Sequence, residues 1–186
     1  MSLPTLSADL LLLHAPAIFD FRSRRDIYFP FLGTSGDVPI TPLYEYFPVG
    51  FRSLRQYLLS SDFDVKIINL STLLIRYPKI DVDQVINALD IGLLGIDLHW
   101  MVHVQGCLAI ARRIKRLRPD IAVILGGISS TYYADELIRY PFVDMVKEAL
   151  GMVGNPVATG VTVGVAICIS ANSVYAAESA ASKVLV

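Results

Sequence analysis

Glycines and hydroxyl side chains occur together at one point of the chain, in a pattern suited to holding a ligand. They directly follow the apolar run Ile121–Leu125, and they are Gly126, Gly127, Ser129, Ser130 and Thr131. Glycines let the backbone approach a ligand without a Cβ and permit positive φ. The hydroxyls can bond that ligand or cap a following helix. A tight turn with a capped helix and no ligand explains the same residues equally well.

A carboxylate and two imidazoles form a second cluster. Asp97 and His99 lie two residues apart at the end of another apolar run, and His103 lies one helical turn beyond His99. Zinc sites need three or four converging ligands, and this cluster supplies no more than these three. Helix capping and surface exposure therefore explain these residues better than a metal site does, and we expect no metal ligands.

Several reaction classes have sequence signatures that are missing here. There is no G-x-S-x-G elbow, no P-loop and no G-x-G-x-x-G after the first apolar run. The net charge of −1 gives no attraction to nucleic acid. The basic residues between Arg112 and Arg118 fit the solvated face of an amphipathic helix. We predict no catalytic residue in the chain and no nucleic-acid partner.

Continuous apolar runs alternate with amphipathic segments, which predicts an α/β fold. Unbroken runs are typical of parallel strands covered on both faces. The expected strands are Asp9–His14, Asp64–Leu70, Ile91–Leu98, Ile121–Leu125 and Phe142–Val146. The expected helices are Val49–Leu59, Val82–Leu89, Val104–Leu117 and Tyr132–Arg139. This alternation favours an open, doubly wound parallel sheet of the flavodoxin-like (Rossmann-like) kind, with strand order 2-1-3-4-5.

Ligands of open α/β sheets bind outside the carboxyl ends of the strands. The glycines and hydroxyls named above follow the fourth strand. The residues after the first and third strands complete the candidate binding site, and they are His14, Ala15, Pro16, Asp97, Leu98 and His99.

Two segments interrupt the alternation of strands and helices. Ala15–Pro48 is a long, aromatic-rich connection, which favours a loop that covers a binding site. From Ala149 to Ala177 no residue is charged. We expect a domain over residues 1–150 and an atypical tail over 151–186, which adds a sixth strand or packs loosely. A membrane segment is the weaker interpretation of this tail. The amino terminus lacks the features of a signal peptide, so a cytoplasmic location is expected.

The stretch from the third to the fifth strand resembles a known family. It reads GLLGIDL, then AIARRIKRLRPDIAVILGGISSTYYADELIRYPFVDMV. This is similar to the amino-terminal cobalamin-binding domain of radical S-adenosylmethionine enzymes, over about residues 9–146. The GG…T segment and the following "vD" strand are the most specific part of the resemblance.

The resemblance implies that cobalamin is the cofactor. Its corrin ring would lie over the strand ends, with the nucleotide tail beside Gly126, Gly127 and Ser129–Thr131. The segment Ala15–Pro48 would lie near the lower face of the corrin. Full-length members also use S-adenosylmethionine and a 4Fe-4S cluster, both held by a catalytic barrel.

The sequence departs from that family in three ways. The charged end after the fifth strand is missing, and only Cys107 and Cys168 are present, so the CxxxCxxC cluster motif is absent. We therefore expect a domain truncated before the barrel and not catalytic alone, with the barrel lost or supplied in trans. The D-x-H-x-x-G signature of a histidine lower ligand is also absent, because Val102 stands where its glycine should be. A histidine-off corrinoid is the expectation.

Two other interpretations remain open. A degenerate interaction domain that has lost its ligand would share the fold and the broken carboxyl end. A signalling receiver would use Asp97 as phosphoacceptor, but it needs an acidic pair after the first strand to hold magnesium. The chain has His14, Ala15 and Pro16 there.

Overall fold

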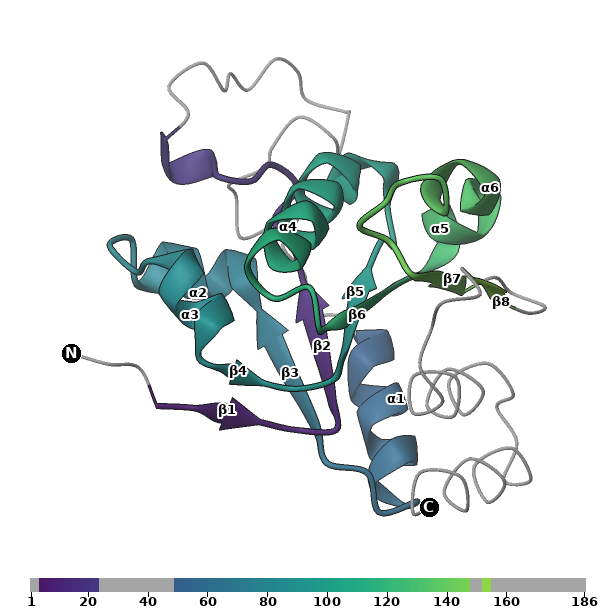
Figure 1. Cartoon of the computed structure of the whole chain (residues 1–186), viewed down its shortest axis with the longest axis horizontal. Helices are drawn as coiled ribbons and strands as arrows, with labels where there is room; N and C mark the ends of the chain where they lie inside the picture. Colours follow the sequence, from purple (N-terminus) through teal and green to yellow (C-terminus); the bar gives the residue numbers. More distant parts are fainter. Residues whose placement is uncertain (1–3, 24–48, 148–151, 155–186) are drawn as a thin grey trace.

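A six-stranded sheet forms the centre of the computed structural model, which describes residues 4–23, 49–147 and 152–154 (Figure 1). Five strands run parallel in the order β3-β2-β5-β6-β7, and β8 pairs antiparallel with β7. They are β2 (Leu10–His14), β3 (Val65–Asn69), β5 (Leu93–Asp97), β6 (Ala122–Gly126), β7 (Met145–Lys147) and β8 (Met152–Gly154). The parallel part has the predicted flavodoxin-like order, so the α/β fold class is confirmed.

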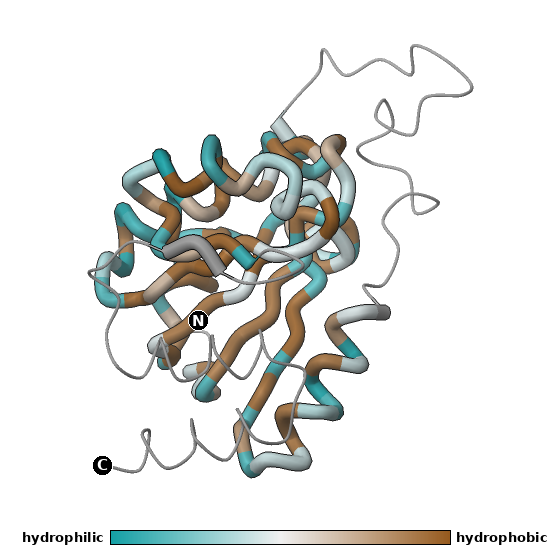
Figure 2. Tube along the Cα trace, turned by 90° about the vertical axis from the view of Figure 1, so that its right-hand side faces the viewer, coloured by the Kyte–Doolittle hydropathy of each residue, from teal (hydrophilic) through white to brown (hydrophobic). Residues whose placement is uncertain are grey.

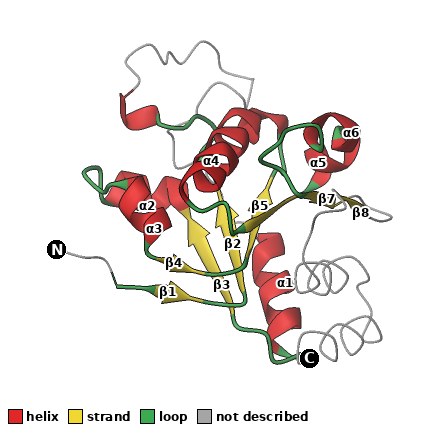
Figure 3. Cartoon of the chain, in the orientation of Figure 1, coloured by secondary structure: helices red, strands yellow, loops and turns green. Residues whose placement is uncertain are grey.

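Helices cover both faces of this sheet (Figure 3). One face packs against α1 (Val49–Leu59), and the other packs against α2 (Leu70–Arg76), α3 (Val82–Asn87) and α4 (Val104–Leu117). The remaining elements are short: β1 (Leu6–Ser7), η1 (Phe21–Ser23), β4 (Leu89–Asp90), η2 (Met101–His103), α5 (Ile128–Tyr132) and α6 (Ala134–Leu137). The strands β1 and β4 form a separate parallel pair.

The core is divided into two parts by the sheet, as the hydrophobic strands between the helical layers show in Figure 2. Successive side chains of a strand point to opposite faces. Accordingly Leu11 and Leu13 pack with α2, α3 and α4, while Leu10 and Leu12 pack with Leu58 of α1. All five residues of β2 are buried, which explains why this strand has a continuous apolar sequence.

Two of the predicted helices are confirmed with the same bounds, and one is wrong. The helices α1 and α4 begin and end where the apolar periodicity does. The helix expected over Tyr132–Arg139 is instead split into α5 and α6 at Tyr133. The first of these begins directly after Gly127, because that residue turns the chain out of β6.

The bounds of two strands also differ from the prediction. Asn69 ends β3 and caps α2, because its side chain accepts a hydrogen bond from the amide of Thr72, so Leu70 is helical. The fifth strand begins at Met145 instead of Phe142. Ile67 is only half-buried, although unbroken apolar runs are typical of covered strands, because β3 is an edge strand among the described residues.

Parts of the two unusual segments lie outside the described residues. These parts are residues 24–48 of the long connection and residues 148–151 and 155–186 at the carboxyl end. Within the tail the structure describes β8, which adds a sixth strand to the sheet after Gly151. How the rest of the tail packs stays a prediction.

Leu94 tests the assignment of the core. Its side chain is completely buried on β5, whereas the side chain of Ile75 on α2 is 42% exposed. We expect Leu94→Ala to lower the free energy of unfolding by about 2–5 kcal/mol, because it leaves a cavity in the packed interior. Ile75→Ala should change it by less than about 1 kcal/mol. Urea denaturation followed by circular dichroism measures both, and equal effects would contradict this core.

Candidate functional site at the carboxyl ends of the strands

The register of the sheet brings the predicted site residues together at the carboxyl ends of the strands, which we call the carboxyl edge of the sheet. His14 lies opposite Asn69 of β3, and Asp97 of β5 lies opposite Gly126 of β6. Because Leu13 pairs with Ile96, the side chains of His14 and Asp97 are neighbours across β2 and β5. The ends of three neighbouring parallel strands, β2, β5 and β6, therefore carry the residues that the sequence indicated.

His14 and Asp97 form a buried pair at the centre of this edge. The Nδ1 atom of His14 lies 3.2 Å from Oδ1 of Asp97, and their side chains are 5% and 12% exposed. The ring of His103 packs against the ring of His14, with centroids 5.1 Å apart. His14 is thus enclosed by protein groups and oriented by a carboxylate.

The three residues considered for a metal site do not converge. His99 is exposed and its ring packs edge-on against Trp100, while His103 is buried against His14. In the part of the chain that the structure describes, no group of three or more histidine, cysteine, aspartate or glutamate residues could hold a metal ion.

The segment that leaves β2 is fixed to the start of α4. The amide of Gly106 donates to the carbonyl of Ala17 at 3.1 Å, and a Cβ at Gly106 would overlap the carbonyl oxygen of Pro16. The side chain of Gln105 bonds both backbone groups of Phe19, accepting from its amide at 2.8 Å and donating to its carbonyl at 3.1 Å. These contacts hold Ala15 and Pro16, both buried, over the end of the sheet.

Arg22 fixes the same segment at a second point. Its guanidinium bonds the carboxylate of Asp20 and donates to the carbonyls of Pro78 and Ile80 at 3.0 and 2.7 Å. Burial raises the pKa of Asp20, but the hydrogen bonds and charge of Arg22 outweigh burial and hold that pKa below its usual value. The pair therefore stabilises the fold above the ordinary aspartate pKa, and this contribution is lost as the pH falls through the lowered value.

Sequence reasoning missed Gln105, Gly106 and Arg22. Each acts on the backbone of a segment about 60 to 90 positions away in the sequence. A glycine inside the helical pattern of Val104–Leu117 was the one available signal, because glycine is unfavourable there unless something packs closely against it.

Gly127 is needed by the protein itself. Its φ is +113°, and a Cβ there would lie 2.8 Å from both the carbonyl carbon and the carbonyl oxygen of Leu98. The amide of Leu98 donates to the carbonyl of Gly126 at 2.6 Å, and the amide of Ser129 donates to the carbonyl of Leu98 at 3.2 Å. The close approach of Gly127 to the backbone of Leu98, with these two hydrogen bonds, therefore joins the turns after β5 and β6. At Gly126 a Cβ would meet Lys147 at 3.8 Å, which is an ordinary contact.

The hydroxyls after Gly127 also bond the backbone. Ser129 donates to the carbonyl of His99 at 3.2 Å, and Ser130 donates to that of Gly127 at 2.7 Å. Thr131 likewise donates to Gly127, at 3.2 Å. The expectation that one of them caps the helix is wrong, because Gly127 is the N-cap residue and no side chain caps α5.

Large apolar side chains are exposed around this edge. Two follow β5 and two lie on α5, and we call them the apolar patch: Trp100 (59% exposed), Met101 (45%), Ile128 (54%) and Tyr132 (78%). The bonds from Ser129 to the carbonyls of Leu98 and His99 hold the start of α5 against the turn after β5. Exposed apolar patches of this kind mark binding surfaces for ligands or proteins.

The basic residues of α4 are mostly held in ion pairs. Arg113 pairs with Asp83, Lys115 with Asp144 at 2.8 Å and Arg118 with Asp120 at 2.6 Å. Among the described residues, Arg112 is the exception. The helix face was expected to be simply solvated, but it is largely neutralised by carboxylates, which does not favour a phosphate-binding surface.

Gly106 tests whether the contact between α4 and the segment after β2 is as close as described. We expect Gly106→Ala to lower the free energy of unfolding by about 1–3 kcal/mol, because the new methyl group displaces the backbone of Pro16. The matched control is Gly50→Ala in α1, where a Cβ meets nothing within 4 Å. That variant should be neutral or slightly more stable. Thermal unfolding measures both, and a neutral Gly106→Ala would contradict the contact.

Comparison with known proteins gives one family. The B12 binding domain family matches residues 37–151, which is more than half of the 186 residues and includes every described element from α1 to β7. No curated protein and no solved structure matches significantly. Among the described residues, no helix is long and apolar enough to cross a membrane. With its flavodoxin-like parallel sheet, the chain belongs to the family of B12 (cobalamin)-binding domains.

Proposed function

We propose that the apolar patch and the turns after β5 and β6 hold cobalamin. The corrin ring would lie on the patch, and the nucleotide tail would pass beside Gly126 and the backbone of Gly127. Bound cobalamin supplies the cobalt chemistry, and the residues of this chain bind and orient it.

One observation carries this proposal. At the strand ends the polar side chains of His14, Asp97, Ser129, Ser130 and Thr131 bond other protein groups. The apolar side chains of Trp100, Met101, Ile128 and Tyr132 are left exposed. A wide, mainly apolar macrocycle fits such a patch, because binding would remove large apolar side chains from water. The surface lies where open α/β sheets bind their ligands.

His14 bears on how the cobalt would be coordinated. It is buried, its Nδ1 faces Asp97 and its ring packs against His103. A side chain enclosed in this way would have to leave its pocket to reach a ligand on the surface. This supports the histidine-off expectation, in which His14 and Asp97 support the floor of the site without touching the metal.

The partner domain follows from the resemblance to radical S-adenosylmethionine enzymes. Cys107 is buried and its Sγ lies 3.1 Å from the carbonyl oxygen of Asp97, and Cys168 lies outside the described residues. Two cysteines do not supply the three that a CxxxCxxC motif contributes. We infer that this domain presents cobalamin to a barrel provided by another chain or by another part of a longer protein.

The signalling alternative has less support. A receiver needs an accessible phosphoacceptor beside acidic groups that bind magnesium. Asp97 is bonded to His14, and β2 leads into buried alanine and proline residues instead of acidic ones.

Reconstitution with hydroxocobalamin tests the proposal. The full chain should retain visible colour after desalting. Trp100→Ala should weaken binding about tenfold, which corresponds to about 1.4 kcal/mol of lost contact. Gly126→Val should weaken it at least as much while staying folded, because the strand end has room for a Cβ but its γ-methyl groups would enter the space proposed for the nucleotide tail.

The control is Tyr140→Ala, which removes an aromatic side chain that is also exposed. Tyr140 precedes β7 and so lies near the amino ends of the strands, opposite the proposed site. It should leave the affinity unchanged. Wild-type protein without retained colour would contradict cobalamin binding and favour the degenerate interaction domain. If wild type binds and both site variants bind equally well, the proposed position is wrong.

A further inference from the structure

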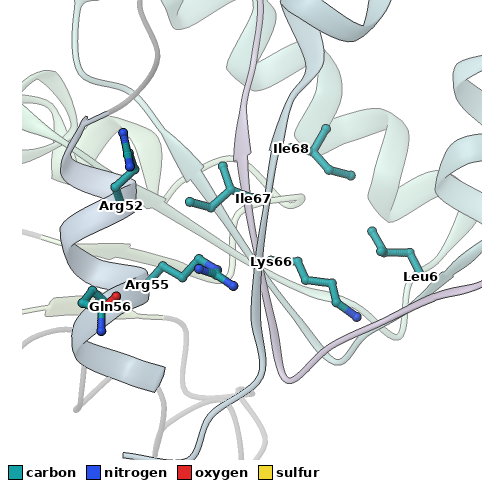
Figure 4. Close-up of a pocket in the computed structure, with 7 residues that line it drawn as sticks. All are labelled: Leu6, Arg52, Arg55, Gln56, Lys66, Ile67 and Ile68. Atoms are coloured by element: carbon teal, nitrogen blue, oxygen red, sulfur yellow. The ribbon is translucent and has the colours of Figure 1, made fainter. Parts of the chain in front are cut away.

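A pocket lies beside the edge strand β3, away from the carboxyl ends of the strands where we propose that cobalamin binds. It has a volume of about 470 Å³ and is formed by α1, β1 and the edge strand β3 (Figure 4). Its lining includes three cations, one amide and aliphatic side chains, among them Arg52, Arg55, Lys66, Gln56, Ile67 and Leu6. None of the described residues that line it is acidic. None of these lining residues belongs to β5, β6 or the turns after them.

Arg55 is oriented for binding an anion. Its Nε donates to the carbonyl of Val65 at 2.8 Å, which fixes the guanidinium against the outer side of β3. Its two terminal nitrogens have no hydrogen-bond partner among the described residues. In Figure 4 the side chain extends from α1 toward β3, next to Ile67. A guanidinium held in this way has little conformational freedom left to lose when it bonds an anion through its remaining donors.

Among the described residues that line the pocket, the charged side chains on the α1 side, Arg52 and Arg55, are both cations. Arg52 and Arg55 lie three positions apart, so they share one face of α1, and the first turn of the helix contains no acidic residue. Arg52 also lies near the positive end of the helix dipole, where a cation is unfavourable. Lys66 on the other side of β3 pairs with Asp64 at 3.3 Å. The described part of the lining therefore presents two guanidinium groups and no carboxylate on the α1 side.

We propose that this pocket binds a phosphate monoester with an apolar body. The dianionic phosphate would bond the free donors of Arg55 and the amide of Gln56, with Arg52 adding charge. The ester group would pack on Ile67, the aliphatic lining residue that lies on the same side of β3 as Arg55. The pocket has the size of small-ligand sites, and the assignment is independent of where cobalamin binds.

Isothermal titration of the full chain with phenyl phosphate, and separately with inorganic phosphate, tests this proposal. Phenyl phosphate should bind with a dissociation constant in the millimolar range or tighter, and more tightly than inorganic phosphate because of the apolar contact. Arg55→Gln should weaken phenyl phosphate about tenfold or more. Arg55→Lys keeps the charge without the planar fork and should give an intermediate loss.

The matched control is Arg112→Gln, which removes the same charge from an exposed position on α4. It should change the affinity by less than about twofold, because exposed charges far apart are screened by salt. Circular dichroism checks that each variant is folded. Lack of saturable binding by wild type up to about 10 mM would overturn the proposal. Equal losses in Arg55→Gln and Arg112→Gln would also overturn it, because they would indicate nonspecific attraction.

Discussion

The close approach of two backbones, Gly127 to Leu98, determines the shape of the surface where we propose that cobalamin binds. The approach requires a residue without a Cβ, and Gly127 also has a φ of +113°, which other residues rarely adopt. Through it the carbonyl of Leu98 accepts the amide of Ser129, and the carbonyl of His99 accepts the hydroxyl of Ser129. The turns after β5 and β6 thus form one rigid surface from which Trp100 and Ile128 project.

Polar and apolar residues have different tasks at this edge. His14, Asp97, Ser129 and Ser130 are mostly buried and bond other parts of the protein, which satisfies groups that would be costly to leave unpaired. Gln105 and Gly106 fix the backbone that covers His14. The exposed side chains include the four of the apolar patch, together with the ring of His99 beside Trp100. A ligand at this edge would therefore meet apolar side chains and backbone, on a surface that is already ordered.

Much of the fold could be predicted from the sequence, because buried parallel strands and amphipathic helices have clear local patterns. The bounds of α1 and α4 follow from apolar periodicity. The strand order does not follow from the sequence alone, and the flavodoxin-like order chosen among doubly wound folds is the one observed. The start of α5 was missed because it depends on the turn at Gly127 and not on a cap. His14, Asp97 and Gly126 lie at the carboxyl ends of their strands, as expected, and their part in binding stays a prediction. That Gly127 serves a backbone contact and that Gln105 binds Phe19 could not be predicted, because both depend on distant parts of the chain.

Hydrogen–deuterium exchange with and without hydroxocobalamin tests the central claim most directly. If cobalamin lies on the joined turns after β5 and β6, the amides of His99–Met101 and Ile128–Tyr132 should exchange more slowly in its presence. The exchange rates of the amides around Tyr140, near the amino ends of the strands, should not change. Protection confined to other parts of the chain, or none at a concentration where the protein is coloured, would contradict the account.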